Sequence, residues 1–177
     1  RIKGDCTVQG SLRAHSIDAK NCGLLQVEGD LSVDTSVAVE RGSLEVKGNL
    51  TARQIMVDDE LTAGGNIDCS SAKAGNAIRV TGNVKAMRVA AGGSINIGSD
   101  ADVERLEAGG SISVRGRIET REFDVGGSGK CNYGRLGKVS IGGSFKAEGA
   151  VEIEKIDVGG SVAVGPGSRV DSVDVGG

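Results

Sequence analysis

The sequence predicts an all-β protein: one parallel β-solenoid, triangular in section, with about ten turns of about 17 residues each. Three observations predict it. A glycine-centred repeat runs through the chain, apolar and polar residues alternate within every repeat, and 30 Gly accompany only 2% aromatic residues in 177. Alternation at period two is typical of strands with one buried face, and a fixed repeat period indicates a solenoid. A core with so few aromatic side chains must be narrow and filled by Val, Ile, Leu and Ala.

Each repeat opens with a glycine and a short polar residue. Two apolar residues follow, separated by one residue of any kind. Two consecutive units read GSINIGSDADVERLEAG and GSISVRGRIETREFDVG. The residue numbers of successive opening glycines differ mostly by 17, by 19 near the N-terminus, and by 11 in one unit. They are Gly10, Gly29, Gly48, Gly65, Gly82, Gly93, Gly110, Gly127, Gly143, Gly160 and Gly177. The pattern predicts a single β-helix domain over residues 1–177.

Three short alternating segments fill a full unit, as in residues 112–114, 118–120 and 123–125. They predict the three sides of a triangular turn. Equivalent strands of successive turns should pair about 4.8 Å apart, which gives a rod roughly 50 Å long. The unit over residues 82–92 is shorter by about one side, so we expect a shortened, two-sided turn there. The longer units near the N-terminus predict longer corners.

Glycine at the corners between strands has two possible physical reasons. Either the corner needs a positive φ, or the backbone of the neighbouring turn approaches too closely for a side chain. The residue after each opening glycine is Ser, Asp or Asn, from Ser11 to Ser161. Such side chains can bond corner backbone groups and one another along the stack. A polar ladder that supports the corners is expected, and a polar binding surface is the alternative.

The cysteines and the single histidine favour no catalytic or metal chemistry. Cys6, Cys22, Cys69 and Cys131 form no CxxC pair and lack histidines at zinc-ligand spacing. Cys6, Cys69 and Cys131 align with apolar positions of the repeat, which predicts buried thiols and a reducing cytoplasm, with disulfides as the alternative. His15 has no partner histidine and is expected to be exposed or in a corner. We therefore expect no enzyme, with no catalytic residue, metal ligand or cofactor.

The charge of the chain indicates which partners it can bind. A net charge of −3 without an excess of basic residues argues against binding to nucleic acid. No apolar stretch approaches the roughly 18 residues of a membrane span. Four carboxylates and Ser140 occupy outward positions of the third segment in successive repeats, so they should line up in one acidic row. Such a row could bind cations or a basic partner. A solvated stripe that limits aggregation is the alternative. The acidic residues are Glu107, Asp124, Asp157 and Asp174.

Units such as AGGSISVRG and VGGSFKAEG resemble the bactofilin family of polymer-forming cytoskeletal proteins. They are also similar to the β-helical repeats of flagellar assembly protein A-like proteins. The resemblance implies a right-handed parallel β-helix that joins end to end into nonpolar filaments, often near a membrane, with disordered tails outside the helical core. The chain starts at Arg1 without a Met, so we expect flanking sequence.

The ends of a solenoid supply an independent argument for self-assembly. An uncapped solenoid exposes an open strand edge and part of its apolar core, and stacking of subunits would bury both. We therefore expect a structural scaffold or cytoskeletal filament protein of the cytoplasm, whose partner is a second copy. Membrane association, or other protein partners, would act through tails. The alternative is a rigid binding or spacer module of a larger surface or assembly protein. The expected junction residues are Cys6, Val8, Val173 and Val175.

Overall fold

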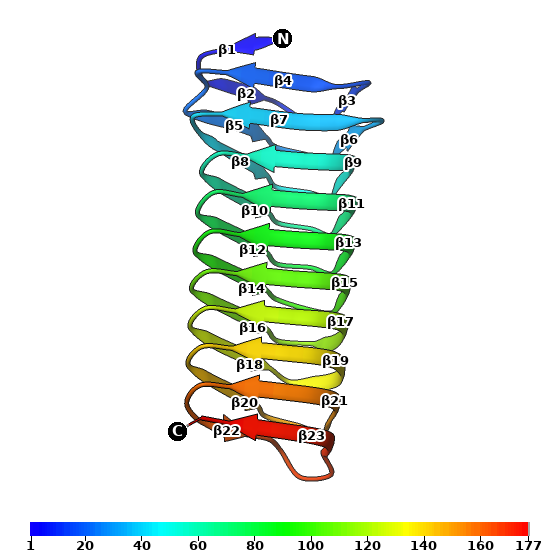
Figure 1. Ribbon diagram of the computed structural model, residues 1–177. Coiled ribbons are helices and arrows are strands. Elements are labelled where there is room, and N and C mark those ends of the chain that lie inside the picture. The colour runs from blue at the N-terminus through cyan, green and yellow to red at the C-terminus, as the bar shows by residue number, and fades with distance from the viewer. Residues whose placement is uncertain (177) are drawn as a thin grey trace.

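The computed structural model describes residues 1–176, which form strands and short corners without a helix. Successive turns of the chain stack along one axis from the N-terminus to the C-terminus and form a rod (Figure 1). All strand pairs are parallel, and equivalent residues of neighbouring turns lie mostly 17 positions apart, as for Asn66 and Asn83. The expected parallel β-solenoid of about ten turns is confirmed.

Two sheets contain all the strands. The ten-stranded sheet consists of β2 (Cys6–Val8), β5 (Leu24–Val27), β8 (Ser43–Val46), β10 (Glu60–Ala63), β12 (Ala77–Val80), β14 (Ser94–Ile97), β16 (Ser111–Val114), β18 (Ser128–Cys131), β20 (Ser144–Ala147) and β22 (Val162–Ala163). The 13-stranded sheet consists of β1 (Ile2–Lys3), β3 (Leu12–Ala14), β4 (Ile17–Lys20), β6 (Leu31–Val33), β7 (Ser36–Glu40), β9 (Leu50–Val57), β11 (Ile67–Ala74), β13 (Val84–Ala91), β15 (Ala101–Ala108), β17 (Arg117–Val125), β19 (Tyr133–Ile141), β21 (Val151–Val158) and β23 (Arg169–Val175).

The turns have three sides, but two of them merge into one strand. The first half of β9 pairs with β6 and its second half with β7. Between the halves Arg53 and Gln54 are both exposed, which interrupts the alternation of buried and exposed residues and marks a corner. We call the ten-stranded sheet the first side, and the first and second halves of strands such as β9 the second and third sides. The three predicted segments of each turn are thus confirmed, joined at one corner without a break.

The coil is right-handed, as the resemblance implied. In Figure 1 the long strands lie nearest the viewer and run from right to left, and the chain returns on the far side while it descends toward the C-terminus. Connections between parallel strands of one sheet have this right-handed sense in almost all proteins.

The predicted short turn at residues 82–92 is wrong. Val84 pairs with Ile67 of the preceding turn and with Ala101 of the next, and both steps have the length of a regular turn. The error came from aligning two glycines that occupy different corners. The N–H of Gly82 donates to the carbonyl of Gly65, whereas that of Gly93 donates to Asn76. The opening glycine lies at one corner in the turns up to Gly82 and at another corner from Gly93 onward. The short spacing between Gly82 and Gly93 is therefore the distance between two different corners, not the length of a turn.

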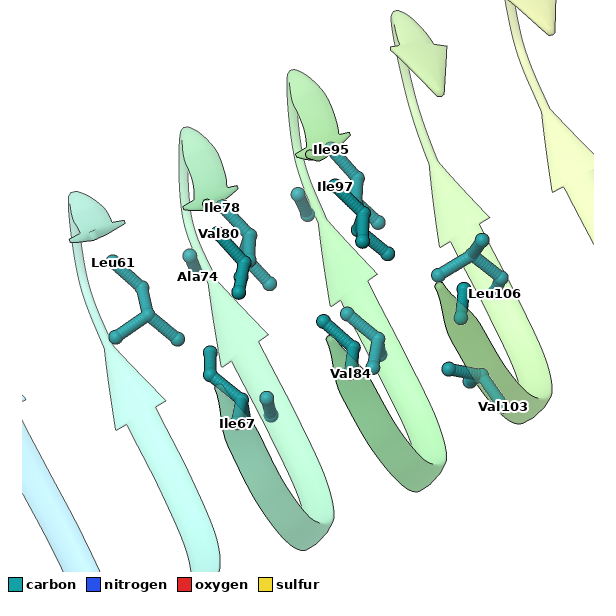
Figure 2. Packing of buried hydrophobic residues seen from close by; sticks show 14 of the residues in the cluster. Leu61, Ile67, Ala74, Ile78, Val80, Val84, Ile95, Ile97, Val103 and Leu106 are labelled. Atoms are coloured by element: carbon teal, nitrogen blue, oxygen red, sulfur yellow. The ribbon is translucent and has the colours of Figure 1, made fainter. Parts of the chain in front are cut away.

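Each inner turn directs two side chains from every side into the core, and these stack on their equivalents in the next turn (Figure 2). In the turn from β14 to β15 all six are buried: Ile95, Ile97, Ala101, Val103, Leu106 and Ala108. Six small to medium side chains fill the whole section of the rod, which explains why aromatic residues are so few.

One turn departs from this composition. The step from Phe123 to its partner Val139 is one residue shorter than in a regular turn, and glycine occupies the inward positions 129 and 134. The ring of Phe123 enters the space beside Gly129, since a Cβ on Gly129 would lie 2.6 Å from that ring. Phe145 meets it edge to face with the ring centroids 6.1 Å apart. Two aromatic rings therefore replace the side chains that the glycines lack.

The paired glycines at the corner between the third and first sides are needed because the backbones of neighbouring turns lie very close together there. A Cβ on Gly126 would lie 2.2 Å from the carbonyl oxygen of Gly109 in the preceding turn. None of these paired glycines has a positive φ within residues 1–176. Near the N-terminus, where this corner is longer and lacks the paired glycines, Asn21 and Arg41 adopt a positive φ.

The polar residues after the opening glycines belong to two corners. Ser94 and its equivalents follow the paired glycines, whereas Ser11, Asp30 and the asparagines lie between the first and second sides. At the latter corner each side-chain oxygen accepts from the backbone N–H of its equivalent one turn further on, as Asn66 Oδ1 does from Asn83 at 2.8 Å. The ladder consists of Ser11, Asp30, Asn49, Asn66, Asn83, Asp100 and the N–H of Arg117. It supports the structural interpretation of these residues.

Candidate functional site

The C-terminal end of the described rod exposes apolar side chains that are covered elsewhere. Val173 and Val175 are 58% and 39% exposed, whereas their partners one turn earlier, Ile156 and Val158, are fully buried. At the other end Cys6 and Val8 are only partly buried and lie over Leu25 and Val27. The four residues expected at junctions therefore lie in the first and last turns of the described rod, directed toward the core.

The acidic row forms on the third side as expected. Register places Glu107 beside Asp124, and Ser140 beside both Asp124 and Asp157. Asp157 in turn pairs with Asp174. Its charge is partly balanced at one end, because Arg88 donates to the carboxylate of Glu107 at 2.7 Å. The other three carboxylates have no ion pair within residues 1–176.

A second row, which the sequence analysis missed, runs beside the acidic one. Arg105, Glu122, Lys138 and Lys155 lie two residues before the first four positions of the acidic row, on the same strands. Arg88 pairs with Arg105 and extends this second row by one turn. All four cations are exposed. The signal is present in the sequence, since these residues follow the same spacing as the acidic row. On the first side, Lys130 and Lys146 are neighbours in successive turns, and both lie near the carboxylate of Glu148.

A hollow of about 600 Å³ opens on the second side where Gly137 leaves the corner without a side chain. Arg121, Arg135, Glu152 and Glu154 are among the residues that line it, and Arg135 and Glu152 form an ion pair at 2.9 Å. At its floor the hydroxyl of Thr120 donates to the carbonyl of Glu122 at 3.0 Å. The lining therefore carries both signs of charge, and its one buried hydroxyl already has a partner.

The cysteine thiols are free. Cys69 and Cys131 are buried, as their alignment with apolar positions predicted, whereas Cys6, which the same alignment placed among them, is half-buried. Cys22 is buried as well. Burial raises the pKa of Cys69 and of Cys131 to about 12. For Cys22, burial and then the carboxylate of Asp5 raise the pKa. Because the thiolate is the reactive form, these buried groups are held as inert thiols.

His15 and the metal-ligating residue types form no centre. The Nδ1 atom of exposed His15 lies 3.4 Å from the carboxylate of Asp34. No group of three or more His, Cys, Asp or Glu residues that could hold a metal ion occurs within residues 1–176.

The described part of the chain contains no helix with the length and hydropathy needed to cross a membrane.

The raised pKa values of the Cys69 and Cys131 thiols predict that the protein loses stability at alkaline pH. Unfolded thiols ionise near pH 9, whereas Cys69 and Cys131 keep their protons to about pH 12, so the unfolded state binds fewer protons in this range. Stability should therefore fall as pH rises above 9, by about 1.4 kcal/mol per pH unit for each thiol. Urea unfolding between pH 8 and 10.5 measures the slope. The variant Cys69→Ala/Cys131→Ala should show a shallower slope, and an equal slope would contradict the assignment.

No family model, curated protein or solved structure matches the chain.

Proposed function

We propose that this protein is a structural, non-enzymatic scaffold whose copies join end to end into filaments. The exposure of Val173 and Val175 in the last described turn, set against the complete burial of Ile156 and Val158 one turn earlier, is the observation that carries the proposal. Burying one valine side chain fully contributes about 1.5–3 kcal/mol. A second rod stacked on this turn would return both valines to the environment that every inner turn gives its equivalents.

Backbone groups add to this argument. β23 pairs with β21 on one side, and within residues 1–176 its other edge has no strand neighbour. Unpaired N–H and C=O groups on a strand edge are a template for another chain, and a stacked subunit would continue the ladder. Burial of apolar surface and continuation of the sheet would therefore act at the same junction.

The repeats themselves favour a bactofilin-like polymer over other solenoid classes. Their Gly-Gly-Ser units resemble those of that family, and the regular stack of about ten turns is consistent with it. We propose a cytoskeletal role in the cytoplasm or at a membrane surface, with no cofactor. Attachment to the membrane or to other proteins would use segments outside the rod.

The end-to-end junction is tested by the double variant Val173→Asp/Val175→Asp. Both residues are exposed, so the rod should stay folded, as circular dichroism would show. Placing two carboxylates in the junction should abolish elongation, because charges cannot be buried there without partners. Negative-stain electron microscopy of the purified chain and of the variant is the measurement. Filaments are expected from the first, and short rods alone from the second.

A matched control adds the same two charges elsewhere. Met87 and Tyr133 are exposed by 59% and 45% and lie in inner turns, so Met87→Asp/Tyr133→Asp should leave filaments intact. Filaments of unchanged length from Val173→Asp/Val175→Asp would refute this junction. Uniform short rods from the unmodified chain across salt and protein concentration would refute self-assembly and favour the rigid spacer.

A further inference from the structure

The third side presents two straight columns of outward side chains on one sheet face. The leading column is Ser36, Gln54, Ser71, Arg88, Arg105, Glu122, Lys138, Lys155 and Ser172. The trailing column is Ala38, Met56, Lys73, Ala90, Glu107, Asp124, Ser140, Asp157 and Asp174. Members of one strand are two residues apart, so the columns run about 6.7 Å from each other.

Charge divides this face into two halves along the rod. From Arg88 onward the leading column is basic apart from Glu122 and the terminal Ser172, and from Glu107 onward the trailing column is acidic apart from Ser140. Nearer the N-terminus, the two columns carry no charge at Ser36, Ala38, Gln54 and Met56, and the side chain of Met56 is 44% exposed. The face thus combines an uncharged patch with a pair of oppositely charged stripes.

We propose that the third side binds the third side of a second copy, with the two rods parallel and in the same register. Consider a two-fold axis that runs along the rod between the columns. Rotation about it lays the leading column of one copy on the trailing column of the other at the same height, so that Lys155 meets Asp157 and Arg105 meets Glu107. An isologous contact of this kind is self-complementary.

The antiparallel alternative is opposed by the same charges. A two-fold axis across the rod would lay each column on itself with its order reversed. At full overlap, Lys155 would then face Gln54 and Asp157 would face Met56, so these charges would meet uncharged side chains. At the axis itself, Arg105 and Glu107 would each face their own copy. Charged side chains left without an opposite partner, and like charges opposed at the axis, disfavour this arrangement, so the two stripes favour the parallel orientation.

A hollow in the face supplies a second observation. About 400 Å³ is open around Ala90, and Lys73, Glu107 and Asp124 are among its lining residues. In the parallel arrangement Arg88 of the second copy faces Ala90. Its guanidinium group would enter the hollow beside the carboxylate of Asp124, and the small side chain of Ala90 leaves the room for it. The carboxylate of Glu107 in the same hollow already accepts from Arg88 of its own chain at 2.7 Å.

The unpaired charges and the area of the third side are both consistent with binding to a second copy. Lys138, Lys155, Asp124 and Asp157 make no ion pair within residues 1–176, so they are available to a second copy. Glu122 is the exception in its column and would face Asp124 of the second copy, but Arg105 of the same chain binds Glu122 at 2.5 Å and offsets its charge. A face about 50 Å long and four residues wide would bury roughly 1,300 Å² in total, above the roughly 1,000 Å² that specific interfaces need.

The test uses the end-blocked variant Val173→Asp/Val175→Asp, so that side-by-side pairing is measured without filaments. Sedimentation equilibrium at low salt should show a dimer, weakened about tenfold or more at 1 M salt because charges are then screened. Adding Lys138→Glu/Lys155→Glu should weaken the dimer about tenfold or more, and so should Asp124→Lys/Asp157→Lys. Mixing these two reversed chains should restore a heterodimer, since each supplies the charge that the other lacks.

A matched control and a crosslink complete the test. Lys130→Glu/Lys146→Glu makes the same charge change on the first side and should leave the dimer intact. With Cys6→Ser in the background, a mixture of Gln54→Cys and Met56→Cys chains should crosslink more readily through a short dithiol-reactive reagent than either chain alone. A monomeric end-blocked chain, charge reversals without effect, or no preferential crosslinking in the mixture would overturn the proposal. Filament formation is read separately, so each proposal can fail without the other.

Discussion

Replacing Phe123 by Ala is expected to lower the free energy of unfolding by about 3–5 kcal/mol, the largest effect of any single truncation in the core. The ring fills a turn in which Gly129 and Gly134 supply no inward side chain, so neighbouring residues cannot close the space. The edge-to-face contact with Phe145 is lost as well. Urea unfolding followed by circular dichroism measures the change.

A second substitution at the same place distinguishes packing from a general loss of stability. Gly129→Ala in the unmodified chain should cost about 1–3 kcal/mol, because the new Cβ would lie 2.6 Å from the ring of Phe123. In the Phe123→Ala background the ring is gone, and the close contact that stays is with the terminal methyl group of Ile141 at 2.7 Å, which can rotate into the vacated space. The added methyl group should therefore become neutral or stabilising. An equal cost in both backgrounds would show that the ring and Gly129 do not depend on each other.

The variant Gly126→Ala is expected to destabilise the rod by about 1–3 kcal/mol or more. The added Cβ would lie 2.2 Å from the carbonyl oxygen of Gly109, a backbone atom that cannot move without shifting the turn before it. Because equivalent glycines stack in neighbouring turns, the strain has no nearby flexible side chain to absorb it. Thermal unfolding of the variant is the measurement.

Gly176→Ala provides the matched control at the same corner in the last described turn. There a Cβ would lie 3.5 Å from the nearest carbonyl oxygen, which is ordinary contact. Its stability should stay close to that of the unmodified chain. Equal losses from both variants would mean that glycine is needed for its conformational freedom and not for the approach of the neighbouring turn.

Much of the architecture could be predicted from local pattern. The alternation in residues 112–114, 118–120 and 123–125 identified the inward side chains of all three sides, because successive side chains of a strand point to opposite faces. The acidic row followed from the same pattern together with the spacing of the repeat. Junction residues were placed in the terminal turns by their position in that pattern.

The shortened turn was the main error, and it shows the limit of aligning on one residue type. Glycine is favoured at any corner where the neighbouring backbone comes close, so it marks corners without saying which one. Asn76 and Ser99 occupy the equivalents of Gly93 and Gly82, and only strand pairing shows this. The basic column was missed because it changes from arginine to lysine and is interrupted by Glu122, although its members are regularly spaced.

The sequence by itself determined the strand pattern, the turn length and the residues of the narrow core, because each depends on a period that neighbouring residues express. Tertiary structure decided which corners stack, how Phe123 fills the space beside Gly129, and that a basic column lies next to the acidic one. All three features depend on contacts between residues that lie a whole turn apart. Backbone pairing between neighbouring turns sets which residues meet, and the side chains of a single turn do not reveal that register.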